Sequence, residues 1–379
     1  MSAHHLLRLL AMCAGLVTTG CASMRPAATN PDEPPLNRVR TEVSRRFETL
    51  EAPGAVFGIY RGAETEPALF LPLGYADERH TRPIRREDHF RIASLTKTFV
   101  GQVVLQLVDE GKLELDDPVS KYLPNVVPNG ENITIAMLGY HTSGVPREMA
   151  NPELQKALQA EPGRQWKAEE VLAYTWSMKP LFPPGKGWMY SNSNTIVLGE
   201  VIRAVTGEPW YEVVTERIVK PLGLSQTGYP QQSRVPEPTP RGYRFGQKDN
   251  LARYGDYWFD STDWSGSVWG ASGDMYSTMD DVAKFMRAAA RGELVGPAGR
   301  EAAFKWVDTG YENIEYGFHI ARRDGGIGNT GDIPGFSSFA MYLPKHDLTI
   351  VCLANLTATP AKLTAAAELG ELAVRLLGP

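Results

Sequence analysis

Ser94 and Lys97, in the stretch Ser94-Leu95-Thr96-Lys97, are spaced so that a nucleophile could lie beside its own base. Apolar residues follow at helical spacing through Val108, so both side chains would share one face at the start of a helix. A lysine withdrawn from water can lose its proton and then accept the proton of a serine hydroxyl. The pair therefore predicts acyl transfer. A serine at a helix start can also be only a cap, and this alternative stays open.

A second segment, Tyr190-Ser191-Asn192, offers a proton carrier and an amide, which acyl transfer needs besides a nucleophile. It follows the tight turn Pro183-Pro184-Gly185 and precedes an apolar helix near residues 194–205. We expect the Tyr190 phenol, beside a cationic lysine, to ionise partly and act as a base. We expect the Asn192 side chain to form hydrogen bonds both to a substrate carbonyl and to the lysine. The alternative for Tyr190 is a core tyrosine whose hydroxyl is satisfied internally.

A third segment, Gly328-Asn329-Thr330-Gly331 followed by Asp332, is rich in glycine, which lets backbone approach a ligand closely. A strand edge here could offer an amide to a developing oxyanion. The letters G-x-G-x-x-G, from Gly326 to Gly331, would mark a dinucleotide site only between a strand and a helix. A proline, a glycine and a strand-like pattern follow instead, which argues against a nucleotide.

Other catalytic patterns are incomplete. The stretch Gly270-Ala271-Ser272-Gly273-Asp274 just misses the G-x-S-x-G elbow. The histidines lack the spacing of metal ligands, so we expect no metal and no cofactor. The net charge is −5 and the basic residues are scattered, which argues against nucleic acid as a partner.

The elements that must position these groups are strands at both ends of the chain and helices between them. We expect strands at residues 55–60, 68–74, 316–320, 337–343 and 348–353. We expect helices at residues 36–50, 94–111, 134–140, 168–176, 194–205, 209–219 and 360–377, with another started by Ser277 or Thr278.

An antiparallel sheet built from both chain ends, flanked by helices, would carry a mostly helical insertion, so the fold class is α+β. The α/β part would cover about 36–112 and 270–379, and the insertion about 113–269. The aromatic-rich residues 254–269 would wall a substrate cleft or fold onto their own aromatics.

The N-terminus predicts export. Residues 1–20 have the short apolar core of a signal peptide, and the small residues before Cys21 resemble a lipoprotein cleavage site. The alternative is a plain secretory signal that is cut nearby. In the lipoprotein interpretation, Cys21 would carry lipid and hold the protein at the bacterial cell envelope, facing the periplasm, and Ala22 favours the outer membrane. Residues 21–35 form a proline-rich tether. Cys352 lies in an apolar run and is expected to be core.

The order S-x-x-K, Y-x-N and a late T-G resembles the serine β-lactamase and penicillin-recognising hydrolase family. The branch is that of class C β-lactamases, D-alanyl-D-alanine carboxypeptidases and related esterases. Further phrases of the resemblance are Leu115-Asp116-Asp117-Pro118, His141-Thr142-Ser143-Gly144 and Pro221-Leu222-Gly223-Leu224. It covers the chain from about residue 53 onward and implies the β-lactamase/transpeptidase-like fold.

The resemblance also implies roles for single residues. Ser94 would be acylated, Lys97 would accept its proton, and Tyr190 would share the proton transfers and activate the deacylating water. Asn192 would orient the substrate amide. Asn329, Thr330 and Gly331 would bind substrate, and the backbone N–H groups of Ser94 and Asp332 would form the oxyanion hole.

One departure concerns Asn329, where the family usually has lysine or histidine. An uncharged amide weakens the hold on a substrate carboxylate, unless Arg322 or Arg323 restores the charge. We therefore expect an envelope serine hydrolase for D-Ala-D-Ala-like peptides, amides or carboxylic esters. The alternatives are a penicillin-binding or sensing module with little turnover, and a weak β-lactamase. The expected partners are a small-molecule or peptide substrate and a membrane reached through the lipid anchor. The sequence leaves the oligomeric state open.

Overall fold

The computed structural model describes residues 35–378 except 231–233, 247–256 and 360–362. The predicted signal peptide, Cys21 and the tether up to residue 34 lie outside the described residues. Pro35, assigned to the tether, instead begins the first helix, α1 (Pro35–Glu48). Within the described ranges, no helix combines the length and apolar character needed to cross a bilayer.

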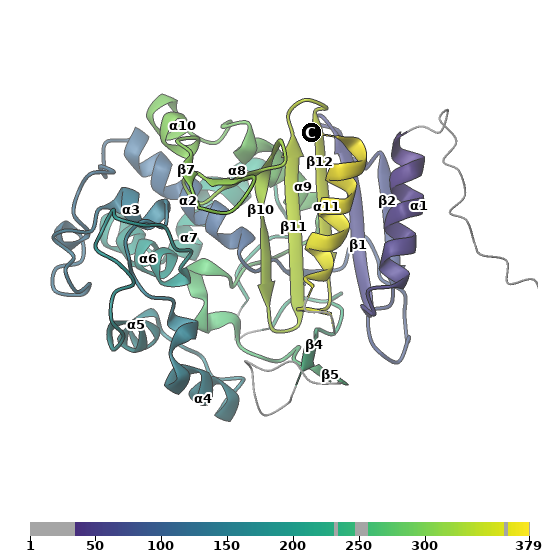
Figure 1. The fold of residues 1–379 in the computed structure, drawn as a ribbon, viewed down its shortest axis with the longest axis horizontal. Helices are drawn as coiled ribbons and strands as arrows, with labels where there is room; N and C mark the ends of the chain where they lie inside the picture. The colour runs from purple at the N-terminus through teal and green to yellow at the C-terminus, as the bar shows by residue number, and fades with distance from the viewer. Residues whose placement is uncertain (1–34, 231–233, 247–256, 360–362, 379) are drawn as a thin grey trace, which may run out of the picture. The chain divides into compact units, whose positions relative to one another are not determined.

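The described part of the chain forms an eight-stranded antiparallel sheet in the order β2-β1-β12-β11-β10-β9-β8-β7 (Figure 1). The two ends of the chain meet inside it, because β1 pairs with β12 from Ala55 opposite Ala354 to Arg61 opposite Leu348. This confirms the predicted α+β fold class. The strands are β1 (Gly54–Arg61), β2 (Leu69–Gly74), β7 (Val307–Asp308), β8 (Ile314–Tyr316), β9 (Ala321–Arg323), β10 (Gly326–Ile333), β11 (Phe336–Leu343) and β12 (Leu348–Ala354).

Helices cover both faces of this sheet, since alternate side chains of a strand point to opposite faces. On one face α1 and α11 (Ala365–Leu377) pack over a core that contains Phe57 and Cys352. On the other face α2 (Leu95–Asp109) and α9 (Met279–Ala290) pack over a core that contains Val56 and Leu353. Cys352 is fully buried, which confirms it as a core residue, and this burial raises the pKa of its thiol.

Most of the remaining helices lie between α2 and β6 (Tyr276–Ser277). They are α3 (Ile135–Gly139), α4 (Pro152–Ala160), α5 (Ala168–Trp176), α6 (Asn192–Thr206), α7 (Trp210–Val214) and α8 (Lys220–Leu222). A π-helical turn, Thr215–Val219, joins α7 to α8. The strands β4 (Tyr243–Gly246) and β5 (Tyr257–Asp260) form a separate pair. After α9 comes α10 (Pro297–Ala303).

Two of the local differences from the expected elements concern a strand and a helix. The strand predicted at residues 316–320 is wrong, because β8 ends at Tyr316 and the chain turns before β9. The turn holds His319 at a φ of 56°, which a strand cannot contain. The helix α4 was not predicted, although Asn151 accepts hydrogen bonds from Glu153 and Leu154 as a regular N-cap.

The segment before α2 is anchored by a buried ion pair. The short strand β3 (Phe90–Arg91) pairs with β6. Arg91 donates a 2.7 Å hydrogen bond to Asp274, and both side chains are only 2% exposed. Ala93 then has a φ of 50°, which is rare for a residue with a Cβ and concentrates at functional sites. This strained turn leads directly into the start of α2.

Candidate active site

Ser94 is the N-cap residue of α2, yet its side chain makes no capping hydrogen bond. Its hydroxyl instead lies 3.0 Å from the Nζ of Lys97, one helical turn along. The alternative in which Ser94 only caps a helix is therefore excluded, and the predicted pairing of hydroxyl and amine is confirmed.

The backbone carbonyl of Ser272 fixes the other side of the Lys97 amine. Nζ donates to this carbonyl oxygen at 2.7 Å, and the side chain of Lys97 is completely buried. Ser272 ends the 3₁₀ turn Gly270–Ser272, which lies in the stretch that misses the G-x-S-x-G elbow. This stretch thus belongs to the site through its backbone, a role that side-chain patterns could not reveal.

The environment of Lys97 suits a proton acceptor. Burial lowers the pKa of the Lys97 amine to about 7, because a charged ammonium loses its hydration there. Glu148 and Asp332 oppose this shift of the pKa, whereas Arg147 adds to it. A substantial fraction of the amine is therefore neutral near neutral pH and able to take a proton from Ser94.

Tyr190 lies just before α6, in hydrogen-bonding reach of Ser94, with its ring 4.9 Å from the Lys97 amine. The expected partial ionisation of the phenol is wrong. Burial and the neighbouring Tyr316 raise the pKa of Tyr190 well above 10, and the hydrogen bond with Ser94 only partly opposes them. Desolvation is the largest cause, and it outweighs the Ser94 hydrogen bond and the charge of Arg147, which both lower the pKa. Tyr190 is therefore a neutral phenol.

Two buried histidines stand behind Tyr190. The His141 ring lies 4.7 Å from the Tyr190 ring and 5.1 Å from the His319 ring, measured between centroids. The Nδ1 atom of His141 accepts from the Ser191 N–H and faces the Asn194 amide, which assigns the proton to Nε2. Burial lowers the pKa of His141 well below 6.5 and that of His319 to about 3. Both rings are neutral and both residues have positive φ.

Glu148 is a buried carboxylate that the sequence analysis missed. Asn192 donates to its Oε1 at 2.7 Å, and the Ser193 hydroxyl donates to its Oε2 at 3.1 Å. The predicted bond between Asn192 and Lys97 is therefore replaced by one to Glu148. The carboxylate fixes the Asn192 amide and supplies a negative charge near Lys97. Its position, soon after His141-Thr142-Ser143-Gly144, was the available sequence signal.

The strand β10 passes directly beside the nucleophile. A Cβ added at Gly331 would lie 2.5 Å from the Ser94 nitrogen, so only glycine allows this approach. Strand β9 pairs only with residues Gly326 to Gly328 of β10, and no strand of the described chain pairs with the rest of that edge. The G-x-G-x-x-G letters thus lie within a strand that another strand follows, which excludes the context of a dinucleotide site.

Asn329 is buried and is not among the residues that line the cavity described below, so its predicted role in substrate binding stays a prediction. The residue is 6% exposed, and its Nδ2 donates to the Thr98 hydroxyl at 3.4 Å. Neither suggested arginine replaces the missing charge. Arg322 pairs with Glu315, and Arg323 pairs with Glu371 at 2.7 Å.

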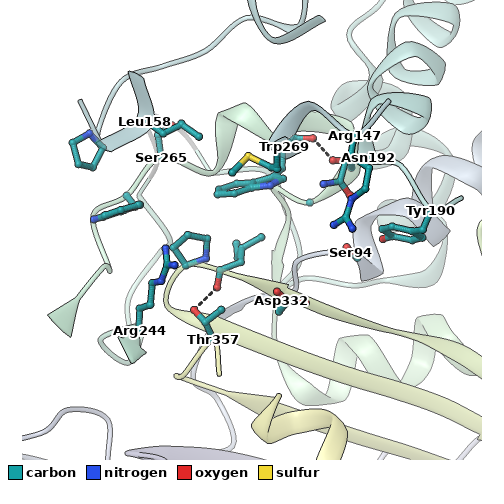
Figure 2. Close-up of a pocket in the computed structure, with 17 residues that line it drawn as sticks. Ser94, Arg147, Leu158, Tyr190, Asn192, Arg244, Ser265, Trp269, Asp332 and Thr357 are labelled. Atoms are coloured by element: carbon teal, nitrogen blue, oxygen red, sulfur yellow. Dashed lines mark hydrogen bonds between the residues drawn. The ribbon is translucent and has the colours of Figure 1, made fainter. Parts of the chain in front are cut away.

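A cavity of about 250 Å³ opens over Ser94 (Figure 2). Tyr190 and Asn192 lie on its walls, and Asp332 contributes from β10. Solvent reaches the Asp332 carboxyl, but protein atoms surround it, which raises its pKa while Arg147 and Lys97 oppose the rise. Thr330 and Gly331 are not among the lining residues, which are Ser94, Arg147, Met149, Leu158, Pro162, Tyr190, Asn192, Arg244, Trp264, Ser265, Trp269, Ser272, Gly273, Asp332, Ile333, Pro334 and Thr357.

Aromatic side chains form part of this cavity wall. Trp264 and Trp269 both line it, which favours the cleft-wall interpretation of residues 254–269, of which 254–256 lie outside the described residues. No group of three or more histidine, cysteine, aspartate or glutamate side chains that could hold a metal ion occurs in the described ranges.

The chain is similar to known proteins over most of its length. The family model described as Beta-lactamase matches residues 41–375. The putative penicillin-binding protein PbpX of Bacillus subtilis is 31% identical over 285 residues, which are 75% of this chain and 66% of that protein. The chain thus spans slightly less than two thirds of that relative's length.

The similar solved structures include two hydrolases. A D-stereospecific amidohydrolase from Streptomyces sp. shares 29% identity with a TM-score of 0.76, covering 85% of this chain and 95% of that one. A D-amino acid amidase from Ochrobactrum anthropi SV3 has a TM-score of 0.79 and 24% identity, covering 90% of this chain and 99% of that one. The second likeness bears on the fold alone.

Proposed function

Because this chain belongs to the β-lactamase family of serine hydrolases, we propose that it hydrolyses amides, D-Ala-D-Ala-like peptides or carboxylic esters through an acyl-enzyme on Ser94. One observation carries the proposal. The Lys97 amine lies 3.0 Å from the Ser94 hydroxyl in an environment that lowers the pKa of the amine to about 7. A base with such a pKa, in contact with a hydroxyl, is what serine activation requires near neutral pH.

Acylation follows from these positions. The Ser94 oxygen attacks the substrate carbonyl carbon while its proton passes to the Lys97 amine. The carbonyl oxygen becomes an oxyanion and accepts hydrogen bonds from the backbone N–H groups of Ser94 and Asp332. The bond to the leaving group then breaks. The leaving group takes a proton from the neutral Tyr190 hydroxyl, which is replenished from Lys97.

Deacylation reverses these proton transfers. Water attacks the acyl carbon as its proton passes through the Tyr190 hydroxyl to Lys97, and the Ser94 oxygen leaves with a proton. Tyr190 acts here as a neutral relay, since its pKa lies well above 10. Asn192, fixed by Glu148, orients the acyl part of the substrate from the cavity wall.

The substrate class rests on two lines of support. The similarity to the Streptomyces D-stereospecific amidohydrolase favours amides or peptides with a D-configured residue. Asn329 brings no cation to β10, so a charge that holds a substrate carboxylate would have to come from another part of the cavity. We also propose that the signal peptide and Cys21 place the enzyme on the bacterial envelope. Globomycin treatment, which blocks lipoprotein signal cleavage, should then cause a larger precursor to accumulate, and Cys21→Ala should abolish lipid labelling.

A fluorophosphonate probe tests the nucleophile. The probe should label the purified wild type and not Ser94→Ala, and equal labelling of both proteins would refute the assignment. Steady turnover of 4-nitrophenyl butyrate and of a D-amino acid amide should accompany labelling. Labelling with penicillin and no turnover of any ester, amide or peptide would instead support the sensing module.

A further inference from the structure

Arg147 is a cation inside the cavity that the reaction described above does not use. It lies on the loop after His141-Thr142-Ser143-Gly144 and is exposed to solvent. Its side chain lines the same cavity as Ser94, Tyr190 and Asn192. In Figure 2 it lies beside Asn192, with Ser94 nearby and Asp332 on the opposite wall.

The guanidinium of Arg147 has no partner in the described part of the chain, neither a hydrogen bond nor an ion pair. The arginines first suggested for the site, Arg322 and Arg323, are both neutralised elsewhere by Glu315 and Glu371. Even Asp332, across the cavity, does not reach ion-pair distance of Arg147. Five donors in a planar fork are thus available to an incoming group.

The charge of Arg147 acts at the reacting centre. It lowers the pKa values of Lys97, Tyr190 and Asp332. These groups surround Ser94, so an anion bound to Arg147 would lie near the bond that is broken. A guanidinium in this position is suited to a carboxylate, which it can bind through two parallel hydrogen bonds.

We propose that Arg147 binds a carboxylate of the substrate and so makes the enzyme prefer substrates with a negative charge close to the scissile bond. The inference rests on the proposed function and specifies its substrate class. The cation usual at position 329 is thereby replaced by one on a loop outside the sheet. A charge-assisted pair of this kind should favour an anionic substrate about tenfold to a hundredfold.

The carboxylate could belong to the acyl part or to the leaving group, and paired esters separate the two. For the acyl part, mono-4-nitrophenyl glutarate is compared with methyl 4-nitrophenyl glutarate. For the leaving group, 4-carboxyphenyl butyrate is compared with 4-carbamoylphenyl butyrate. In each pair the measured quantity is the ratio of kcat/KM for the anionic ester to that for the neutral ester.

The variants are Arg147→Gln, Arg147→Lys and the control Arg203→Gln. Arg203 is an exposed arginine of α6 that pairs with Glu200, so its loss changes the net charge equally outside this cavity. Arg147→Gln should lower the ratio at least tenfold in one pair of esters, Arg147→Lys should retain most of it, and Arg203→Gln should leave it unchanged. A ratio within twofold of wild type in both pairs for Arg147→Gln would overturn the inference.

A binding measurement decides the inference without turnover. Benzoate and benzamide are titrated against the fluorescence of Trp264 and Trp269, which line the cavity. Wild type should bind benzoate more tightly than benzamide, and Arg147→Gln should abolish the preference. Equal preference in both proteins would overturn the inference. If wild type keeps its preference for benzoate but hydrolyses none of the esters, only the proposed hydrolase function is refuted.

Discussion

Gly331 and Ser94 approach so closely that a single methyl group would not fit between them. A Cβ on Gly331 would lie 2.5 Å from the Ser94 nitrogen, 2.8 Å from the Ser338 hydroxyl and 2.9 Å from the Ala93 Cβ. Two of these atoms are backbone or are attached directly to it, so they cannot move without shifting the nucleophile. The contact sets the distance between β10 and the start of α2.

Gly331→Ala should therefore reduce kcat/KM for a 4-nitrophenyl ester by about a hundredfold or more, because a displacement of about 1 Å misaligns the reacting atoms. The control is Gly163→Ala, since a Cβ there would meet nothing closer than the Asp263 carbonyl at 3.9 Å. Circular dichroism should show both variants folded. An active Gly331→Ala enzyme would mean that β10 does not bound the oxyanion site.

The pH dependence should report on Lys97. Its neutral form is the base, so log kcat/KM should rise with a slope of one below a pKa of about 7 and level off above it. His141 and His319 cannot produce this rise of kcat/KM near pH 7, because burial lowers the pKa values of both side chains. Stopped-flow or plate assays from pH 5 to 9 measure this pH dependence of kcat/KM.

Two substitutions should move this limb in opposite directions. Glu148→Gln removes a negative charge that raises the pKa of Lys97, so the limb should move to lower pH. Arg147→Gln removes a positive charge that lowers the same pKa, so the limb should move to higher pH. If the rising part of the pH profile stays at the same pH in both variants, it reports the titration of a group other than Lys97.

Tyr190→Phe should affect substrates according to their leaving groups. An amide nitrogen or an alkoxide needs a proton as it departs, and loss of a positioned acid typically costs about a hundredfold to ten-thousandfold. 4-Nitrophenolate leaves without a proton, so acylation by its esters should fall much less. The measurement is the burst phase with each substrate. Equal losses for both classes would show that Tyr190 does not protonate the leaving group.

Arg91→Met should destabilise the fold strongly. Burial raises the pKa of Asp274 to about 7 and the Arg91 charge opposes this, so removal of the arginine leaves an uncompensated buried carboxyl. Breaking such a pair costs about 3–5 kcal/mol. Arg45→Met, which removes an exposed pair with Glu42, should cost less than about 1 kcal/mol. Urea unfolding compares the two, and similar losses would contradict the argument.

The sequence predicted those features that depend on neighbours along the chain. The helix Ala168–Trp176 was predicted with its observed bounds, and Ser94 and Lys97 lie together because one helical turn joins them. Tyr190 and the glycines of β10 were proposed from their residue types, but only the family resemblance implied that they meet Ser94, since nothing local shows it.

The errors concern interactions between segments that are distant along the chain. Arg322 and Arg323 face carboxylates on β8 and α11, which no spacing along the chain reveals. The role of Glu148 depends on its contact with Asn192 from another loop. The ionisation of Tyr190 was misjudged because a pKa depends on total burial, which sequence alone does not give.

The pairing of β1 with β12 has a consequence for biosynthesis. The sheet that supports the nucleophile stays incomplete until the last strand has left the ribosome, because its inner strands come from opposite ends of the chain. Such long-range pairing is slow to form. A nascent polypeptide of this topology therefore cannot complete its sheet before β12 has been made, so the surroundings of Ser94 are assembled only at the end of synthesis.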